Sequence, residues 1–305
     1  MKIPVTHLCY PLASLPDSVH APILREYAAN GAKHIVLASS LIGRMLQEPD
    51  FIFKMKKTLA ETGLDFCDAH APWGTWSDLG IPLGEYRKLA VAQQRAAIRL
   101  CGIFGVTTMA FHTGTTFNSV FGKNRTLEDY YQALLRSLEE LLPTADECGV
   151  IIALENQGTP LNHSGRLLRI VQEFNSPRLG LCYDTGHGNV AEKGRGCPEK
   201  TYLPGIWNDA GLEVEWEENL IEKFLPWLVN CHLHDNDGMN DQHKLPGDGV
   251  VDWKRIVSNL EKAPRLHNIQ NEAITTYPNG YTIKGACRLF NELVGHIEQA
   301  GKDKK

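Results

Sequence analysis

Eight short apolar runs recur along the chain, and a longer segment with helical spacing separates each run from the next. The runs lie at residues 3–10, 34–40, 64–72, 107–114, 150–158, 179–187, 228–236 and 268–276. Most are rich in apolar and β-branched residues, as buried parallel strands are. Eight strands that alternate with helices predict a (β/α)8 TIM barrel. A doubly wound sheet is the alternative, but no run is followed by the G-x-G-x-x-G or P-loop sequence that such a sheet would use to hold phosphate.

The segments between these runs carry the spacing and the end signals of helices. In residues 126–149, TLEDYYQALLRSLEELLPTADECG, apolar residues recur three and four apart. Thr126 is placed to cap this helix, with Asp129 three residues on, and Gly149 closes it. Further helices are expected to start near Asp17, Pro49, Leu83, Ser164, Asp252 and Thr282. No linker or low-complexity tract interrupts the pattern, so we expect residues 1–305 to form one domain.

The connection between Asp184 and His232 is longer than the others. Its first part, residues 188–215, is rich in Gly and Pro and lacks helical periodicity. A long irregular loop in a compact domain is usually functional or disordered. We therefore predict that this segment is irregular and acts as a lid that brings Trp207 toward the site.

The composition limits the classes of protein to which the chain can belong. With 43% hydrophobic and 22% charged residues, it predicts a globular protein. The formal net charge of −5 argues against a nucleic-acid partner, which usually requires a basic surface. The eight cysteines include no C-x-x-C pair, which predicts reduced thiols and a cytoplasmic location. Prolines interrupt the first residues, where a signal peptide needs an unbroken apolar stretch, and no apolar run is long enough to span a membrane.

His, Asp or Glu residues stand at the C-terminal ends of six successive predicted strands. They are His70, His112, Glu155, Asp184, His187, His232 and Glu272. In a barrel these ends meet at one face, which carries the active site. Carboxylates gathered there would repel one another and resist burial, and a divalent cation resolves that conflict. The mixed imidazole and carboxylate set favours Zn, Mn, Co or Fe over Ca.

The stretch from His232 to Gly249, HLHDNDGMNDQHKLPGDG, supplies three histidines and four aspartates. The two-residue period of a strand places His232 and His234 on one face of the seventh strand. Asp241 and His243 follow, two residues apart, in the loop above the barrel. A solvated surface loop is the alternative interpretation, but the convergence of the other strand ends favours a metal site.

Six motifs carry a resemblance to a known family: DAHAP, LENQG, LCYDTGH, HLHDND, DQHKLPGDG and NEA. Together they resemble the xylose isomerase-like TIM barrel superfamily. This superfamily includes sugar phosphate isomerases and epimerases, ketose 3-epimerases, inosose dehydratase and the endonuclease IV type of AP endonuclease. The resemblance implies that one divalent metal has four protein ligands, namely Glu155, Asp184, His232 and Glu272. In the ketose epimerases the two glutamates also act as acid and base, and the residue at the position of His187 contacts the substrate.

The endonuclease IV pattern implies further ligands, which would hold up to three metals. The additional positions are His70, His112, His187, Asp241 and His243, and all are filled here. The acidic net charge and the sequences of the motifs DTGHGN and DQHKLPGDG instead favour the sugar isomerase branch. Where ketose epimerases have an Arg that grips the sugar, this chain has His243, which argues against a simple free-ketose 3-epimerase. We take His232 as the strand-seven ligand, which leaves His234 to face the substrate or to support the ligands.

We therefore expect a divalent-metal-dependent isomerase or epimerase of a sugar or sugar derivative, with Glu155 and Glu272 as the catalytic pair. It would transfer a proton through an enediolate and hold one to three ions of Zn, Mn or Co. A small carbohydrate would contact His187, Trp207, His234 and His243. The alternatives are an AP endonuclease, a keto-sugar dehydratase or lyase at the same site, and a binding module without activity. We expect no nucleic-acid partner and no membrane association, and we leave a homo-oligomer open.

Overall fold

The computed structural model describes residues 3–9, 11–115, 125–275 and 279–300. Eight parallel strands close into a barrel in chain order, and β8 pairs with β1. The strands are β1 (Val5–His7), β2 (His34–Leu37), β3 (Asp65–His70), β4 (Thr108–Phe111), β5 (Ile151–Glu155), β6 (Leu179–Asp184), β7 (Leu228–Leu233) and β8 (Asn268–Asn271). Each lies within one of the eight apolar runs, so the predicted (β/α)8 architecture is confirmed.

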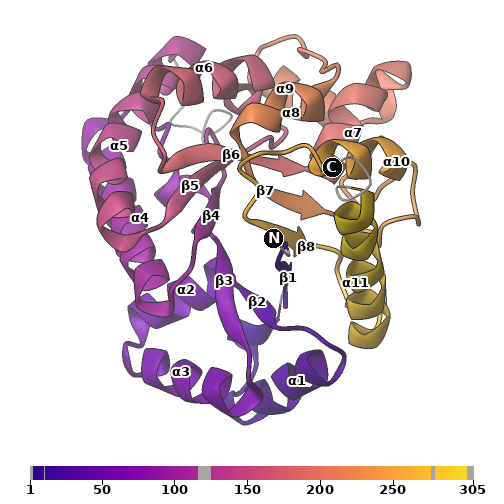
Figure 1. The fold of residues 1–305 in the computed structure, drawn as a ribbon. Coiled ribbons are helices and arrows are strands. Elements are labelled where there is room, and N and C mark those ends of the chain that lie inside the picture. Colours follow the sequence, from indigo (N-terminus) through magenta and orange to yellow (C-terminus); the bar gives the residue numbers. More distant parts are fainter. Residues whose placement is uncertain (1–2, 10, 116–124, 276–278, 301–305) are drawn as a thin grey trace.

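Helices surround the strands on the outside of the barrel (Figure 1). The α-helices are α1 (Asp17–Ala29), α2 (Ser39–Gln47), α3 (Asp50–Thr62), α4 (Gly84–Phe104), α5 (Leu127–Cys148), α6 (Ser164–Phe174), α7 (Thr185–Lys193), α8 (Tyr202–Asp209), α9 (Leu220–Phe224), α10 (Trp253–Leu260) and α11 (Ile283–Ala300). Short 3-10 helices are η1 (Leu12–Ser14), η2 (Thr75–Ser77), η4 (Pro160–Asn162), η5 (Gly194–Gly196), η6 (Pro198–Lys200) and η7 (Leu225–Trp227). All the helix starts expected from the sequence are confirmed within one residue.

Helix α5 has the ends that its sequence predicts. The Thr126 hydroxyl accepts a hydrogen bond from the backbone N–H of Asp129, and the Asp129 carboxylate accepts one in return from the N–H of Thr126. Such a reciprocal pair satisfies two backbone donors that would otherwise lack partners at a helix start. Gly149 ends the helix at a φ of 72°, a left-handed conformation that glycine adopts without strain.

The prediction that residues 188–215 are irregular is wrong. Helix α7 continues to Lys193, two 3-10 helices follow, and α8 covers Tyr202–Asp209. Val190, Leu203 and Trp207 pack into a small buried apolar cluster that fixes these short helices against the barrel. Tertiary packing therefore overrides the weak helical propensity of a segment rich in Gly and Pro.

The apolar core lies largely between the strands and the surrounding helices, whereas the middle of the barrel holds buried polar side chains. These are Thr6, Asp68, Thr108, Asn230, Asn268 and Gln270. The Asp68 carboxylate accepts hydrogen bonds from the Thr108 hydroxyl at 2.8 Å and the Asn230 amide at 3.0 Å. Burial raises the pKa of Asp68 to about 6. The barrel thus carries a polar layer beneath its C-terminal end, which the sequence analysis did not predict.

Among the described residues, no helix combines the length and the apolar character needed to cross a lipid bilayer.

Candidate metal centre

The ionisable residues predicted from the strand ends meet at the C-terminal end of the barrel. Glu155 and Asp184 are the last residues of β5 and β6, and Glu272 directly follows β8. His232 lies in β7, where its Cα pairs with that of Asp184 across the β6–β7 ladder. All four side chains are buried. The parallel register therefore gathers the four predicted ligands into one cluster.

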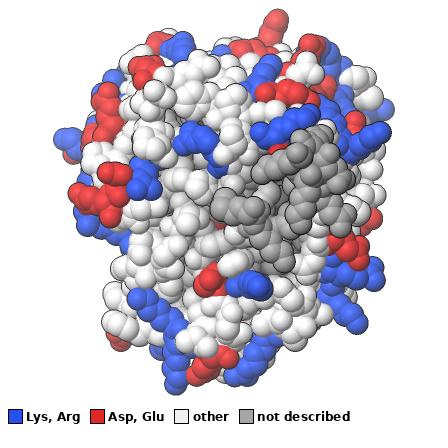
Figure 2. All heavy atoms as spheres, in the orientation of Figure 1, with Lys and Arg blue, Asp and Glu red and all other residues white. Residues whose placement is uncertain are grey.

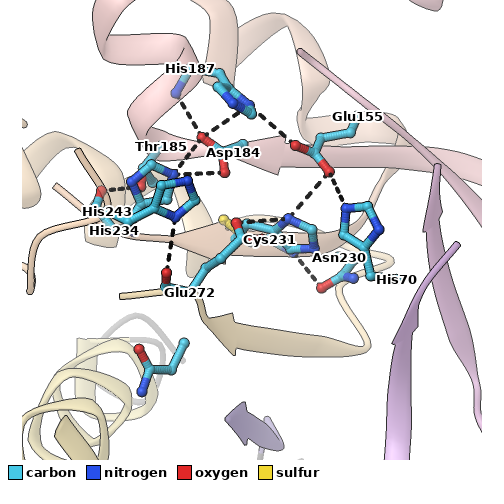
Figure 3. A network of polar contacts seen from close by, with 12 residues as sticks. His70, Glu155, Asp184, Thr185, His187, Asn230, Cys231, His234, His243 and Glu272 are labelled. Atoms are coloured by element: carbon cyan, nitrogen blue, oxygen red, sulfur yellow. Dashed lines mark hydrogen bonds and ion pairs between the residues drawn. The ribbon is translucent and has the colours of Figure 1, made fainter. Parts of the chain in front are cut away.

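Glu155 stands at the centre of four imidazoles. Its Oε1 lies 3.2 Å from His112 Nε2 and 3.1 Å from His187 Nδ1, and its Oε2 lies 3.3 Å from His232 Nδ1 and 3.7 Å from His70 Nε2. The side chains of His70 and His187 approach it from β3 and α7 (Figure 3). One carboxylate is therefore shared between the groups contributed by β3, by the end of β4, by α7 and by β7.

The other two carboxylates contact different histidines of β7 and its following turn. Glu272 Oε2 lies 3.2 Å from His232 Nδ1, so His232 stands between both glutamates. Asp184 instead contacts His234, whose Nε2 lies 2.9 Å and 3.0 Å from the two carboxylate oxygens. Asp184 also accepts a hydrogen bond from the backbone N–H of His187 and so caps α7. Both histidines of the HLH sequence thus belong to the cluster.

The loop after β7 returns over the site and adds two more candidate ligands. Asp241 Oδ2 lies 3.4 Å from His187 Nε2 and 3.2 Å from His243 Nε2. The ring of His243 stacks on that of His234, with the centroids 4.0 Å apart and the planes 10° from parallel. Asp241 and His243 thus lie together beside His187 and His234.

Asp235 shapes this loop and is a residue whose role the sequence analysis missed. It is fully buried, and its carboxylate accepts hydrogen bonds from the backbone N–H groups of Asn236, Gly247 and Val251 and from the Trp253 indole. Its backbone also pairs with that of Lys244 in a short antiparallel bridge. Three of these four donors lie 12 to 18 residues along the chain, so no local sequence signal indicates this role.

The imidazoles of the cluster favour the ionised form of its glutamates. Burial would raise the pKa of Glu155, but the imidazoles of His112 and His232 outweigh burial and hold that pKa well below its usual range. Burial would likewise raise the pKa of Glu272. The neighbouring imidazole of His232 outweighs this effect and lowers the pKa of Glu272 below its ordinary value. Burial lowers the pKa of His70 to about 4, which leaves this imidazole neutral, the form that binds metal.

The side chains fit a divalent cation. Glu155 Oε2, His232 Nδ1 and Glu272 Oε2 are buried and lack a hydrogen-bond partner among the described residues, although they lie close together. Buried polar atoms without partners are costly, and a metal ion would satisfy all three. Several sets of side chains in this region have candidate ligand atoms within 4.8 Å of one another, among them His70/His112/Glu155, Glu155/Cys182/His232, Glu155/Asp184/His187 and His234/Asp241/His243.

A cavity of about 570 Å³ opens above the cluster. Its wall includes His70, His112, His187 and His243, so these residues face a space where a small molecule can bind. Trp207 lies elsewhere, in the wall of a smaller neighbouring pocket that shares His187 with the cavity. Its indole is buried and donates a hydrogen bond to the carbonyl of Gly158. Its described contacts therefore give Trp207 a packing role, and its proposed contact with substrate stays a prediction.

Comparisons with curated proteins find partial relatives, and two of them carry the name of an activity. The chain is 25% identical over 177 residues to a D-psicose 3-epimerase of Enterocloster bolteae, covering 56% of this chain and 48% of the relative. It is 28% identical over 177 residues to a protein of Mycoplasma mobile named probable endonuclease 4, covering 52% of each. The chain thus spans about half the length of the curated relatives it matches.

Solved structures match over nearly the whole chain. A D-tagatose 3-epimerase-like protein superposes with a TM-score of 0.70 at 18% identity, covering 99% of this chain and 100% of the other. A xylose isomerase-like TIM barrel protein from Mycobacterium smegmatis, solved in complex with magnesium, superposes with a TM-score of 0.66 at 16% identity, covering 98% of each chain. A family model described as xylose isomerase-like TIM barrel matches residues 24–273. This match confirms the resemblance carried by the strand-end motifs, and the chain belongs to the xylose isomerase-like TIM barrel family.

Proposed function

We propose that the protein is a divalent-metal-dependent isomerase or epimerase of a sugar or sugar derivative. The observation that carries the proposal is the placement of Glu155 and Glu272, two buried carboxylates on β5 and beyond β8 that both contact His232. The cavity above them is open to a small molecule. Similarity to sugar 3-epimerases in sequence and fold supports an enzyme of the isomerase or epimerase kind.

The residues that would hold the metal are Glu155, Asp184, His232 and Glu272. His234 contacts Asp184 closely enough to take part or to orient that carboxylate. The mixture of imidazole and carboxylate favours Zn, Mn or Co. When bound, the cation would act as a Lewis acid that polarises a substrate carbonyl and acidifies the neighbouring C–H.

The chain's own groups would move the proton. Glu155 would remove the proton from the carbon beside the carbonyl, and Glu272 would return a proton from the other side of the substrate. The reaction would thus pass through an enediolate of the sugar and would need a carboxylate on each side. His187 and His243 line the cavity and are placed to donate hydrogen bonds to substrate hydroxyls.

Solvent isotope exchange tests this proposal. Protein loaded with Zn, Mn or Co is incubated in D₂O with a panel of ketoses, aldoses and keto-sugars, and each sugar is examined by NMR. We expect deuterium at the carbon beside the carbonyl, and we expect loss of this exchange in Glu155→Gln and Glu272→Gln. The matched control is Glu217→Gln, which changes a buried glutamate that caps α6 through Ser164. The proposal fails if no sugar of the panel takes up deuterium, whichever of the three metals the protein carries.

A second candidate function is metal-dependent hydrolysis of DNA at abasic sites. The observation that favours it is the surplus of candidate ligands, because His70, His112, Asp241 and His243 exceed what one ion requires. Two or three ions could activate water and stabilise the leaving oxygen. Against it, basic and acidic side chains are interspersed around the face shown in Figure 2 rather than gathered in a basic patch. Cleavage of an abasic duplex by zinc-loaded protein would place this function first.

A keto-sugar dehydratase or lyase would share the first proton transfer. It would differ in expelling a hydroxyl from the next carbon instead of returning the proton. The same NMR spectra separate the two, because dehydration consumes the substrate and gives an unsaturated or deoxy product.

A further inference from the structure

Two exposed tryptophans lie between β3 and α4, beside the mouth of the cavity. Trp73 is 57% exposed and Trp76 is 63% exposed. Trp73 forms part of the cavity wall, and its ring centroid lies 6.0 Å from that of His112. Trp76 is not part of that wall and stacks on Tyr86 at a centroid distance of 5.4 Å. A large aromatic side chain left exposed next to a binding cavity indicates a contact surface for a ligand.

The wall of the cavity carries both carboxylates and imidazoles. Glu155, Asp241 and Glu272 contribute carboxylates, and no Lys or Arg lines the cavity among the residues that the structure describes. A phosphate group held away from the metal cluster would have no Lys or Arg of the described wall to pair with it. The described wall therefore favours a ligand without charge.

The cavity is large enough for a ligand bigger than one sugar ring, and part of its wall is apolar. Its volume of about 570 Å³ lies within the range of about 300–1,000 Å³ that is typical of pockets for drug-sized ligands. The wall includes Leu8, Ala38 and Trp73 in addition to the imidazoles and carboxylates. A single sugar ring over the metal cluster would leave part of this volume unfilled.

We propose that the cavity takes an uncharged glycoside, with the reacting sugar over the metal cluster and a second ring or aromatic aglycone against Trp73. This inference rests on the proposed function and adds the substrate class. The flat, apolar face of an indole suits the C–H face of a second sugar or the face of an aromatic ring. The carboxylates and imidazoles of the cluster suit the hydroxyls and the carbonyl of the first.

Binding measurements by saturation-transfer NMR test the inference without the need for turnover. The probes are phenyl β-D-glucopyranoside, phenyl β-D-galactopyranoside and phenyl β-D-xylopyranoside, each with its parent sugar, together with D-glucose 6-phosphate. The proteins are wild type, Trp73→Ala and Trp76→Ala, each purified without chelator. Trp76→Ala is the matched control, because it removes an equally exposed tryptophan of the same loop that lies outside the cavity wall.

We expect at least one phenyl glycoside to bind more tightly than its parent sugar. Trp73→Ala should weaken that binding by about two- to tenfold, as the loss of one aromatic contact does, and should leave the parent sugar unaffected. Trp76→Ala should change neither, and D-glucose 6-phosphate should bind no more tightly than D-glucose. Equal binding of glycosides and parent sugars, tighter binding of the phosphate, or equal effects of the two substitutions would overturn the inference.

The same panel separates failure of this inference from failure of the proposed function. Deuterium exchange into simple sugars, combined with no effect of Trp73→Ala on glycoside binding, would remove the second subsite and leave the isomerase in place. Glycoside binding that depends on Trp73, without any exchange, would keep the subsite and remove the isomerase. A changed elution volume of Trp73→Ala in size-exclusion chromatography, with unchanged glycoside binding, would assign Trp73 to a subunit interface and overturn the inference.

Discussion

Gly186 lies so close to His234 that it has no room for a side chain. A methyl group built at Gly186 would lie 2.6 Å from Nδ1 and 2.7 Å from Nε2 of His234, and closer still to the carbon between them. These separations are far below the roughly 3.5–4.0 Å at which non-bonded atoms pack best. Gly186→Ala must therefore push the imidazole away from Asp184, which it contacts through both carboxylate oxygens.

The size of the effect follows from two losses. Overpacking of a buried site costs about 1–3 kcal/mol, and loss of a hydrogen bond to a charged group costs about 1.5–3 kcal/mol. Movement of the ring relieves part of the strain, so we expect Gly186→Ala to lower the free energy of unfolding by about 3–5 kcal/mol. Urea denaturation followed by circular dichroism measures this change, and the metal content of the same protein should fall.

Two control variants make this prediction specific. Gly43→Ala places a methyl group on α2 where no atom lies within 4 Å, so we expect unchanged or slightly increased stability. In a His234→Ala background the ring is gone, and Gly186→Ala should then cost less than about 0.5 kcal/mol. The reasoning is refuted if Gly186→Ala is as stable as the wild type, or if it costs the same with and without the His234 ring.

Two further predictions concern the loop after β7 and His7, the last residue of β1. Asp235→Ala removes the acceptor of four hydrogen bonds and should speed amide hydrogen exchange at Gly247 and Val251, with a loss of at least about 2 kcal/mol of stability. Unchanged protection of these two amides would contradict the role given to Asp235. Burial lowers the pKa of His7 to about 4 in the folded protein, from an ordinary value of 6.5. The unfolded chain thus binds the proton first, and stability should fall by up to about 3 kcal/mol as the pH drops from 6.5 to 4. His7→Gln should lose less stability over this range than the wild type, and parallel curves for the two proteins would show that His7 is not responsible.

The barrel could be predicted from the sequence because its signals are local. Each buried parallel strand is a short apolar run. The helix between two runs is indicated by apolar residues three and four apart and by end residues such as Thr126 and Gly149. The cluster could be predicted for a topological reason, since successive strand ends in a barrel must meet at one face. Knowledge of the fold therefore placed Glu155, Asp184 and Glu272 together without any side-chain geometry.

The parts that could not be predicted depend on contacts between distant residues. Helices α7 and α8 have few local helix signals, and they are fixed by the cap from Asp184 and by the packing of Trp207 against neighbouring apolar side chains. Asp235 gathers donors from as far along the chain as Trp253, which no local pattern reveals. The division of contacts between His232 and His234 likewise depends on which carboxylate each ring meets in space.

The central claim is that the buried carboxylates and imidazoles form a metal centre, and elemental analysis of protein purified without chelator tests it most directly. We predict one to three divalent transition-metal ions per chain in the wild type and a loss of at least one in Glu272→Gln. His243→Ala tells one ion from several, because it should lower the count only if the group with His234 and Asp241 holds an ion of its own. Absence of bound metal after loading with Zn, Mn or Co and dialysis, or an unchanged metal count in Glu272→Gln, would contradict the claim.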